Sequence, residues 1–143
     1  MLIHSPLIGD VNVDEKQIYT FAQGIPGFES VHRFAFIPLG GDSPFTVIQA
    51  LDQSVPSFIA INPFTVFPDY DFHLPDYVAE QLELVGLEDV ELFSIVTLGK
   101  TLVDSTCNLM APVVLNRRKR AGKQVVLEEN YSRKAPLVKK GEE

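Results

Sequence analysis

The stretch RFAFIPLGGDSPFTVIQALDQSVPSFIAI, residues 33–61, decides the fold class of this chain. It contains three short runs rich in Phe, Ile and Val, at residues 33–38, 44–51 and 57–61. Each run is bounded by Pro, Gly, Asp or Asn, the residues that interrupt strands and start turns. Residues 40–43, Gly-Gly-Asp-Ser, suit a hairpin loop between the first two runs. The stretch therefore predicts three consecutive β-strands.

Further strands are expected on both sides of this stretch. Residues 17–21 alternate apolar and polar side chains, as a half-buried strand does, and residues 90–98 form another apolar run. Residues 109–115 and 124–127 resemble the two arms of a final hairpin, with Gly122 in its turn. Short strands at this regular spacing predict a mainly β, single-domain, antiparallel β barrel-like fold.

One segment has a helical pattern and predicts a single short α-helix. Residues 75–85 place Val78, Leu82 and Val85 on one helical face, behind a proline that suits a first turn. Gly86 follows and is expected to cap the C-terminal end.

Length and composition are those of one soluble domain. The chain has 143 residues and is 45% hydrophobic, enough to bury a core without a disulfide or a metal. Its one cysteine, Cys107, excludes an internal disulfide and is expected to be a small buried apolar residue. We find neither a secretory signal nor a membrane-spanning apolar run, so we expect a cytoplasmic protein without membrane contact. Residues 1–137 are interpreted as the domain, and residues 138–143 as a charged tail that we expect to be disordered.

Charge is unevenly distributed along the chain. Residues 1–99 carry 14 acidic and two basic residues, a net charge of −12, whereas residues 100–143 carry a net charge of +5. Solubility alone explains an acidic surface, but a body of this charge also repels nucleic acid and attracts basic surfaces.

The residues that usually carry catalysis form no recognisable pattern. The three histidines stand far apart, the surroundings of Cys107 match no catalytic signature, and the glycines of residues 24–27 lack the spacing of a phosphate loop. Asp69 and Asp71 stand at alternate positions and leave three readings open: a metal or acid–base site, a protein-binding loop, or a solvated loop. We therefore predict no catalytic residue, no metal ligand and no cofactor.

A basic cluster gives the second candidate function. Residues 117–120 read Arg-Arg-Lys-Arg and Lys123 follows, so these side chains are candidates for gripping the phosphates of a nucleic acid. No aromatic residue lies among the bases to stack on a nucleobase, and the cluster falls in an expected hairpin turn. A solvated turn or a contact with an acidic protein is the favoured interpretation, so direct nucleic-acid binding is not expected.

Several short motifs, in one order across residues 17–136, resemble the FliW family of flagellar assembly factors. They are Phe21-Ala22-Gln23-Gly24-Ile25-Pro26-Gly27-Phe28-Glu29, Pro44-Phe45 with Gln49, Asn62-Pro63-Phe64, Phe67-Pro68-Asp69-Tyr70, Asn108-Leu109-Met110-Ala111-Pro112-Val113, Asn116 and Gly122-Lys123-Gln124. The match depends on their common order, because no single motif is specific. The resemblance implies an antiparallel β barrel-like fold with a small helical addition.

The resemblance also implies a function that involves no catalysis and no small-molecule substrate. Proteins of this family bind flagellin in the cytoplasm as a chaperone-like partner, and they bind CsrA, a small dimeric regulator that represses translation of flagellin mRNA. The two partners compete, so that export of flagellin frees the FliW-like protein to capture CsrA and relieve repression. The negative body of this chain suggests how capture could drive RNA away from CsrA, by placing like charge beside the RNA surface.

The residues expected to contact partners are the exposed members of the matched loops. They are Phe28, Glu29, Phe64, Asp69, Tyr70 and Asp71, with Asn116 and Arg118 as weaker candidates. Simple loop formation is the alternative role for all of them, because loops serve both purposes.

Overall fold

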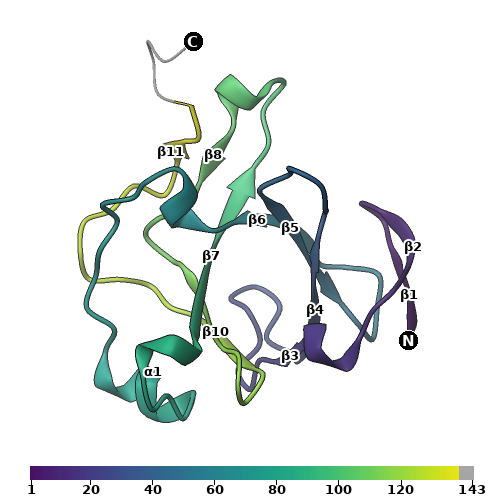
Figure 1. Ribbon diagram of the computed structural model, residues 1–143, viewed down its shortest axis with the longest axis horizontal. Coiled ribbons are helices and arrows are strands. Elements are labelled where there is room, and N and C mark those ends of the chain that lie inside the picture. Colours follow the sequence, from purple (N-terminus) through teal and green to yellow (C-terminus); the bar gives the residue numbers. More distant parts are fainter. Residues whose placement is uncertain (139–143) are drawn as a thin grey trace.

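A computed structural model describes residues 1–138 of the chain, so most of the predicted tail, residues 139–143, lies outside the described residues. Its centre is a closed barrel of seven strands (Figure 1). The barrel strands are β3 (Ile18–Thr20), β4 (Arg33–Pro38), β5 (Phe45–Ala50), β6 (Ser57–Ile61), β7 (Val90–Thr97), β9 (Val113–Asn116) and β10 (Ala121–Gln124). The predicted mainly β fold with a single short α-helix is confirmed.

Closure of the barrel depends on two pairings between strands distant in sequence. Strand β7 pairs with β9 antiparallel, with Leu92 opposite Val114, and β10 pairs with β3 parallel through Ala121 and Thr20. The expectation of antiparallel pairing therefore holds around the barrel except at the short β3–β10 contact. Beyond its contact with β9, β7 continues into a second pairing with β8 (Thr106–Cys107), which β11 (Ala135–Pro136) extends.

The strands predicted from residues 33–61 occur where expected, because each is a β-branched or aromatic run between turn formers. The final hairpin differs from the prediction. Its turn is formed by residues 117–120, and Gly122 lies inside β10, opposite Leu115. A Cβ on Gly122 would lie 2.5 Å from the ring of Phe21, so the glycine is required by packing rather than by a turn.

Two layers cover the outside of the barrel, whose interior is filled by aromatic and aliphatic side chains such as Phe21, Phe34 and Phe93. On one side lies the hairpin of β1 (Leu2–Ser5) and β2 (Gly9–Asn12), which packs over β4 and β5 and was not predicted as a pair (Figure 1). On the other side lie the segment that connects β6 to β7 and the chain after β10 (Figure 1).

The covering segment between β6 and β7 contains three short helices. They are η2 (Pro63–Thr65), α1 (Asp76–Gln81) and η3 (Leu87–Asp89); two further 3₁₀ turns, η1 (Glu15–Gln17) and η4 (Leu102–Asp104), lie elsewhere. Among residues 1–138, none of the helices has the length and apolar character needed to cross a membrane.

Helix α1 is shorter than predicted because the chain turns at its C-terminal end. Glu83 has a left-handed φ of 54°, its amide bonds to the Glu80 carbonyl, and the Leu84 amide bonds to the Ala79 carbonyl. This is a Schellman ending in which Glu83 takes the place usually given to glycine. The predicted cap at Gly86 is therefore wrong. Val78 and Leu82 are buried as expected, but Val85 lies beyond the helix and is 83% exposed.

Candidate binding groove

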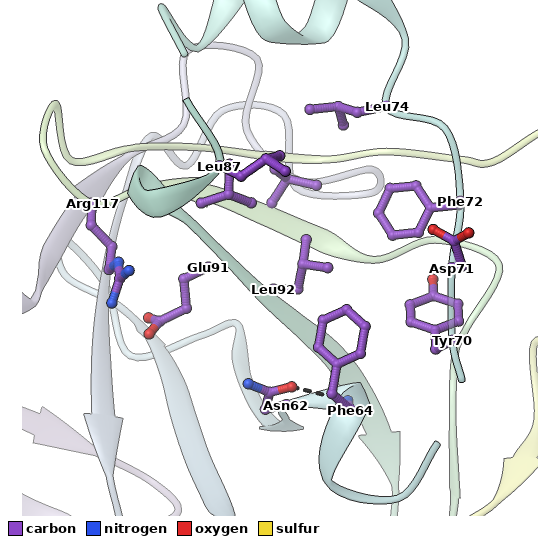
Figure 2. A pocket seen from close by; sticks show the side chains of 12 residues that line it. Asn62, Phe64, Tyr70, Asp71, Phe72, Leu74, Leu87, Glu91, Leu92 and Arg117 are labelled. Atoms are coloured by element: carbon purple, nitrogen blue, oxygen red, sulfur yellow. Dashed lines mark hydrogen bonds between the residues drawn. The ribbon is translucent and has the colours of Figure 1, made fainter. Parts of the chain in front are cut away.

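A groove of about 560 Å³ runs along the outer face of the barrel beside β7 (Figure 2). Most of its wall is apolar, and its charged groups lie at its edges. Its lining residues are Asn62, Phe64, Tyr70, Asp71, Phe72, Leu74, Leu87, Val90, Glu91, Leu92, Val114 and Arg117. The groove brings together three of the residues predicted to contact partners, Phe64, Tyr70 and Asp71. It also includes Arg117, the chain neighbour of two more, Asn116 and Arg118.

The first wall is the short helix η2, which begins directly after strand β6. The Asn62 carboxamide oxygen accepts a hydrogen bond from the Phe64 amide at 3.0 Å, and Pro63 supplies a backbone suited to a first helical turn. This cap presents Phe64 at the surface, 42% exposed, with its ring directed across the groove (Figure 2). The exposure predicted for Phe64 is therefore confirmed.

The second wall is anchored by Tyr70, and here the prediction of exposure is wrong. Only 5% of Tyr70 is exposed, because its ring packs against those of Phe64, Phe72 and Tyr131 at 4.8–5.9 Å. Its hydroxyl donates to the Leu109 carbonyl at 2.7 Å, and burial raises the pKa of the phenol. Tyr70 therefore supports the wall and is not a free contact residue.

The third wall is formed by the chain that leaves α1 and enters β7. Leu87 is 84% exposed even though it lines the groove, and Val85 beside it is similarly exposed. Single exposed leucines are ordinary, but apolar side chains gathered at the rim of an apolar groove mark an interaction surface. Sequence reasoning missed this wall, because it assigned Val85 to a buried helical face.

Asn116 holds the third wall in place from beneath. It is fully buried, and its amide nitrogen donates to the carbonyls of Leu82 at 2.7 Å and Glu83 at 3.2 Å. Its oxygen accepts from the amides of Arg118 at 3.0 Å and Lys119 at 3.1 Å. One side chain thus fixes both the end of α1 and the basic turn. Asn116 lies too deep for the direct contact predicted for it, and the structure assigns it a positioning role.

The basic turn beside the groove is partly committed to contacts within the protein. Arg117 donates to the Glu88 carbonyl at 2.6 Å, and the Arg118 guanidinium lies 3.3 Å from the Asp89 carboxylate. Lys123 donates to the Gln23 side chain at 3.0 Å. These contacts leave fewer of the cluster's positive charges free for phosphates than the sequence suggested.

Two acidic side chains of the groove have no such partner. Within residues 1–138, neither the Asp71 carboxylate nor the Glu91 carboxylate makes a hydrogen bond or an ion pair; only the backbone of Asp71 is held, by the Tyr131 hydroxyl. Figure 2 shows Asp71 on the side of Phe72, and Glu91 on the opposite side, facing Arg117.

Phe28 and Glu29 do not belong to the groove. Phe28 is partly exposed and packs on Phe58 at the start of β6, whereas the groove begins after the end of that strand. The Glu29 carboxylate accepts a hydrogen bond from the Gly27 amide at 3.0 Å, which lowers the pKa of this carboxyl. A Cβ on Gly24, which has a φ of +66°, would lie 2.7 Å from the Glu29 backbone, so this glycine is essential to the turn.

Asp69 lies outside the groove, in a shallower depression that shares Tyr70 with it. Across the described residues, no three His, Cys, Asp or Glu side chains gather as metal ligands do, so nothing there supports the alternative reading of Asp69 and Asp71 as a metal site. Cys107 is buried as expected, and burial raises the pKa of its thiol to about 11.

The closed barrel and its preformed apolar groove define the class: a small β-barrel protein with a surface suited to docking. Residues 2–137 match the model of the family described as FliW protein. The chain therefore belongs to the FliW family, as its motifs indicated.

Individual relatives agree with this assignment. Proteins named flagellar assembly factor FliW from Bacillus subtilis (strain 168) and Geobacillus kaustophilus (strain HTA426) are 39% and 43% identical to the chain over 138 residues. The matches cover 96% of this chain in both cases, and 96% and 95% of the relatives. A solved structure titled crystal structure of the flagellar assembly factor FliW superposes with a TM-score of 0.92, at 39% identity, covering 99% of both chains.

Proposed function

We propose that this chain is a cytoplasmic flagellar assembly factor that binds flagellin as a chaperone-like partner and binds the translational regulator CsrA. Flagellin and CsrA compete for it. When flagellin has been exported, the free protein captures CsrA and relieves repression of flagellin mRNA. The protein acts through occupancy of its surface and not through catalysis.

The observation that carries the proposal is membership of the FliW family over residues 2–137, and the groove gives the function a physical basis. A concave apolar surface with exposed Phe64 and Leu87 is suited to bury the apolar side chains of another protein. The groove volume lies within the range of about 300–1,000 Å³ that is typical of binding pockets.

Two surfaces are proposed for partner contact. The first is the groove, where Phe64 and Asp71 face the partner and where Asp69 and Arg118 lie just outside. The second is the turn that carries Phe28 and Glu29. Tyr70 and Asn116 shape the groove from within and affect partners only through its geometry.

The charge of the chain suggests how CsrA loses its RNA. A body with a net charge of −12 over residues 1–99, docked beside an RNA-binding surface, repels phosphates without filling the RNA site. Because added salt screens this repulsion, the antagonism should weaken as ionic strength rises. Measurement of RNA release from CsrA at about 50 mM and 500 mM salt tests the mechanism, and equal antagonism at both would contradict it.

Calorimetric titration of the full chain with purified flagellin and with purified CsrA tests the function. We expect both to bind, and we expect each to displace the other. Leu87→Ala should weaken binding, whereas the matched variant Leu7→Ala, an exposed leucine on the β1–β2 hairpin, should not. The proposal fails if neither flagellin nor CsrA binds the wild-type chain.

The same purified protein can be used to test the alternative function, in which residues 117–123 bind nucleic acid. Direct binding of an RNA oligonucleotide, with an affinity that falls steeply with salt and is lost on Lys119→Glu, would favour that reading. The internal contacts of Arg117, Arg118 and Lys123 argue against it.

A further inference from the structure

We propose that the groove is electrostatically polarised and therefore binds its partner segment in one direction. The occupant is a segment of a partner protein that has an apolar face. Its basic side chains lie at the Asp71 end of the groove, and an acidic side chain or the carbonyl groups at the end of a helix lie at the Arg117 end. This inference rests on the proposed function, since it assumes a protein partner, and it adds the chemistry and the orientation of the bound segment.

The apolar floor between the two ends requires an apolar occupant. Leu92 of β7 and Val114 of β9 are buried in the barrel wall, and Phe64, Phe72 and Leu87 rise around them (Figure 2). Burying apolar surface contributes about 25 cal/mol per Å², so a few side chains of the partner placed here supply most of the affinity.

The Asp71 end of the groove is strongly acidic. Residues 69–76 and 128–131, which meet where Tyr131 bonds to the backbone of Asp71, contain five acidic residues and no lysine or arginine. The Glu129 carboxylate accepts a hydrogen bond from the His73 amide at 2.7 Å, which lowers the pKa of Glu129. Asp71 itself lines the groove with a carboxylate that no side chain among residues 1–138 neutralises.

The opposite end holds a fixed guanidinium. Arg117 lines the groove, and its hydrogen bond to the Glu88 carbonyl limits its movement. Arg117 and Glu91 are the charged residues that line this end, and the neighbouring Arg118 is paired with Asp89, so this end is close to neutral overall. Figure 2 shows Glu91 at this same end, facing Arg117, but within residues 1–138 no ion pair joins the two side chains, so the guanidinium keeps donors for an acceptor from a partner.

The Asp71 end is therefore more negative than the Arg117 end, a difference that favours one orientation of a charged segment over its reverse. Rim charges of this kind act mainly on the association rate, whereas the apolar floor governs dissociation. An α-helical segment would be expected to direct its positive N-terminal end towards Asp71 and its carbonyl end towards Arg117.

Charge reversal at each end tests the polarity. Purified flagellin and purified CsrA are the probes, and surface plasmon resonance gives both rates. We expect Asp71→Lys to slow association of the partner that uses the groove by about three- to tenfold, with less effect at high salt. Asp42→Lys makes the same charge change on the β4–β5 loop, away from the groove, and should alter the rate less than about twofold.

Crosslinking tests the direction. A photoreactive amino acid at position 72, which lines the groove next to Asp71, should attach to a lysine- or arginine-bearing stretch of the partner. The same group at position 87 should attach to the other end of that stretch. Attachment in the opposite order, or to unrelated parts of the partner, would overturn the inference.

The two proposals fail in different ways. If neither flagellin nor CsrA binds the wild-type chain, the proposed function and the inference are both wrong. If a partner binds and Asp71→Lys, Arg117→Glu and Leu87→Ala all leave both rates unchanged, the proposed function stands and the groove inference is overturned.

Discussion

Replacement of Asn116 by alanine should destabilise the protein more than its single polar side chain suggests. The side chain is fully buried and makes four hydrogen bonds, two to carbonyls at the end of α1 and two to amides of the basic turn. Alanine removes all four hydrogen bonds and provides no other partner for these backbone groups. The carbonyl of buried Leu82 has the least access to water and loses most.

The magnitude follows from the burial of each group. An unsatisfied buried carbonyl costs about 1–3 kcal/mol, and each of the three bonds nearer the surface contributes about 0.5 kcal/mol once water replaces it. The expected loss in the free energy of unfolding is therefore about 2.5–4.5 kcal/mol. With a urea m-value of about 2 kcal/mol/M, the unfolding midpoint should fall by about 1–2 M without a change in m.

Equilibrium urea denaturation followed by circular dichroism measures this loss. Gln124→Ala is the matched control, because it removes one amide hydrogen bond, to the Ala111 carbonyl at 3.1 Å, and should cost about 1 kcal/mol. Hydrogen exchange gives a second, local readout: the amides of Arg118 and Lys119 should lose protection in the Asn116 variant. A loss no greater than that of Gln124→Ala would refute the positioning role.

Three further predictions concern the barrel and its covering layer. Gly122→Ala should lower the free energy of unfolding by about 1–3 kcal/mol in urea denaturation, because the new Cβ would lie 2.5 Å from the Phe21 ring; a neutral effect would show that the ring can move aside. Tyr70→Phe should cost about 1–2 kcal/mol through loss of the hydrogen bond to the Leu109 carbonyl, measured in the same assay, and unchanged stability would contradict the anchoring role. The thiol of Cys107, whose pKa is raised to about 11, should react with Ellman's reagent at pH 8 at least about a hundredfold more slowly in the folded protein than in urea. The pKa of the Cys107 thiol in the folded protein exceeds its unfolded value of about 8.5, so burial of the neutral thiol contributes stability that is fully present below pH 8.5 and is lost as pH rises towards 11. Cys107→Ala should therefore flatten the fall in the free energy of unfolding across this pH range. An equally steep fall in the variant would exclude the thiol as its cause.

The strands could be predicted because the information that specifies them is local. The runs at residues 33–38 and 57–61 begin and end as β4 and β6 do, since turn formers stand immediately beside them. The β1–β2 hairpin was missed because its strands are four residues each and partly exposed, so their alternation is weak. The end of α1 was misplaced because Asn116, 33 residues after Glu83, determines where the helix stops.

The candidate site could be predicted only in part. Phe64 was correctly expected at the surface as a member of a matched loop. The structure supplies the physical reason, because Asn62 and Pro63 begin a short helix there and the next side chain points outward. Tyr70 was expected to be exposed because acids flank it, but the rings of Phe72 and Tyr131 enclose it. Leu87 and Glu91 drew no attention in the sequence, because a single leucine or glutamate has no distinctive pattern until its neighbours are placed.

The amino-acid sequence alone specifies the class of the fold, the uneven distribution of charge and, through the order of the motifs, the family. Each of these depends on composition or on patterns a few residues long. Three features arise only when the chain is folded: the closure of the barrel through β7–β9 and β3–β10, the burial of Asn116 beneath the groove wall, and the position of Asp71 and Arg117 at opposite ends of one apolar groove. The groove is assembled from segments up to 55 residues apart, from Asn62 to Arg117, and packing between such distant segments is a property of the folded chain that local preference does not encode.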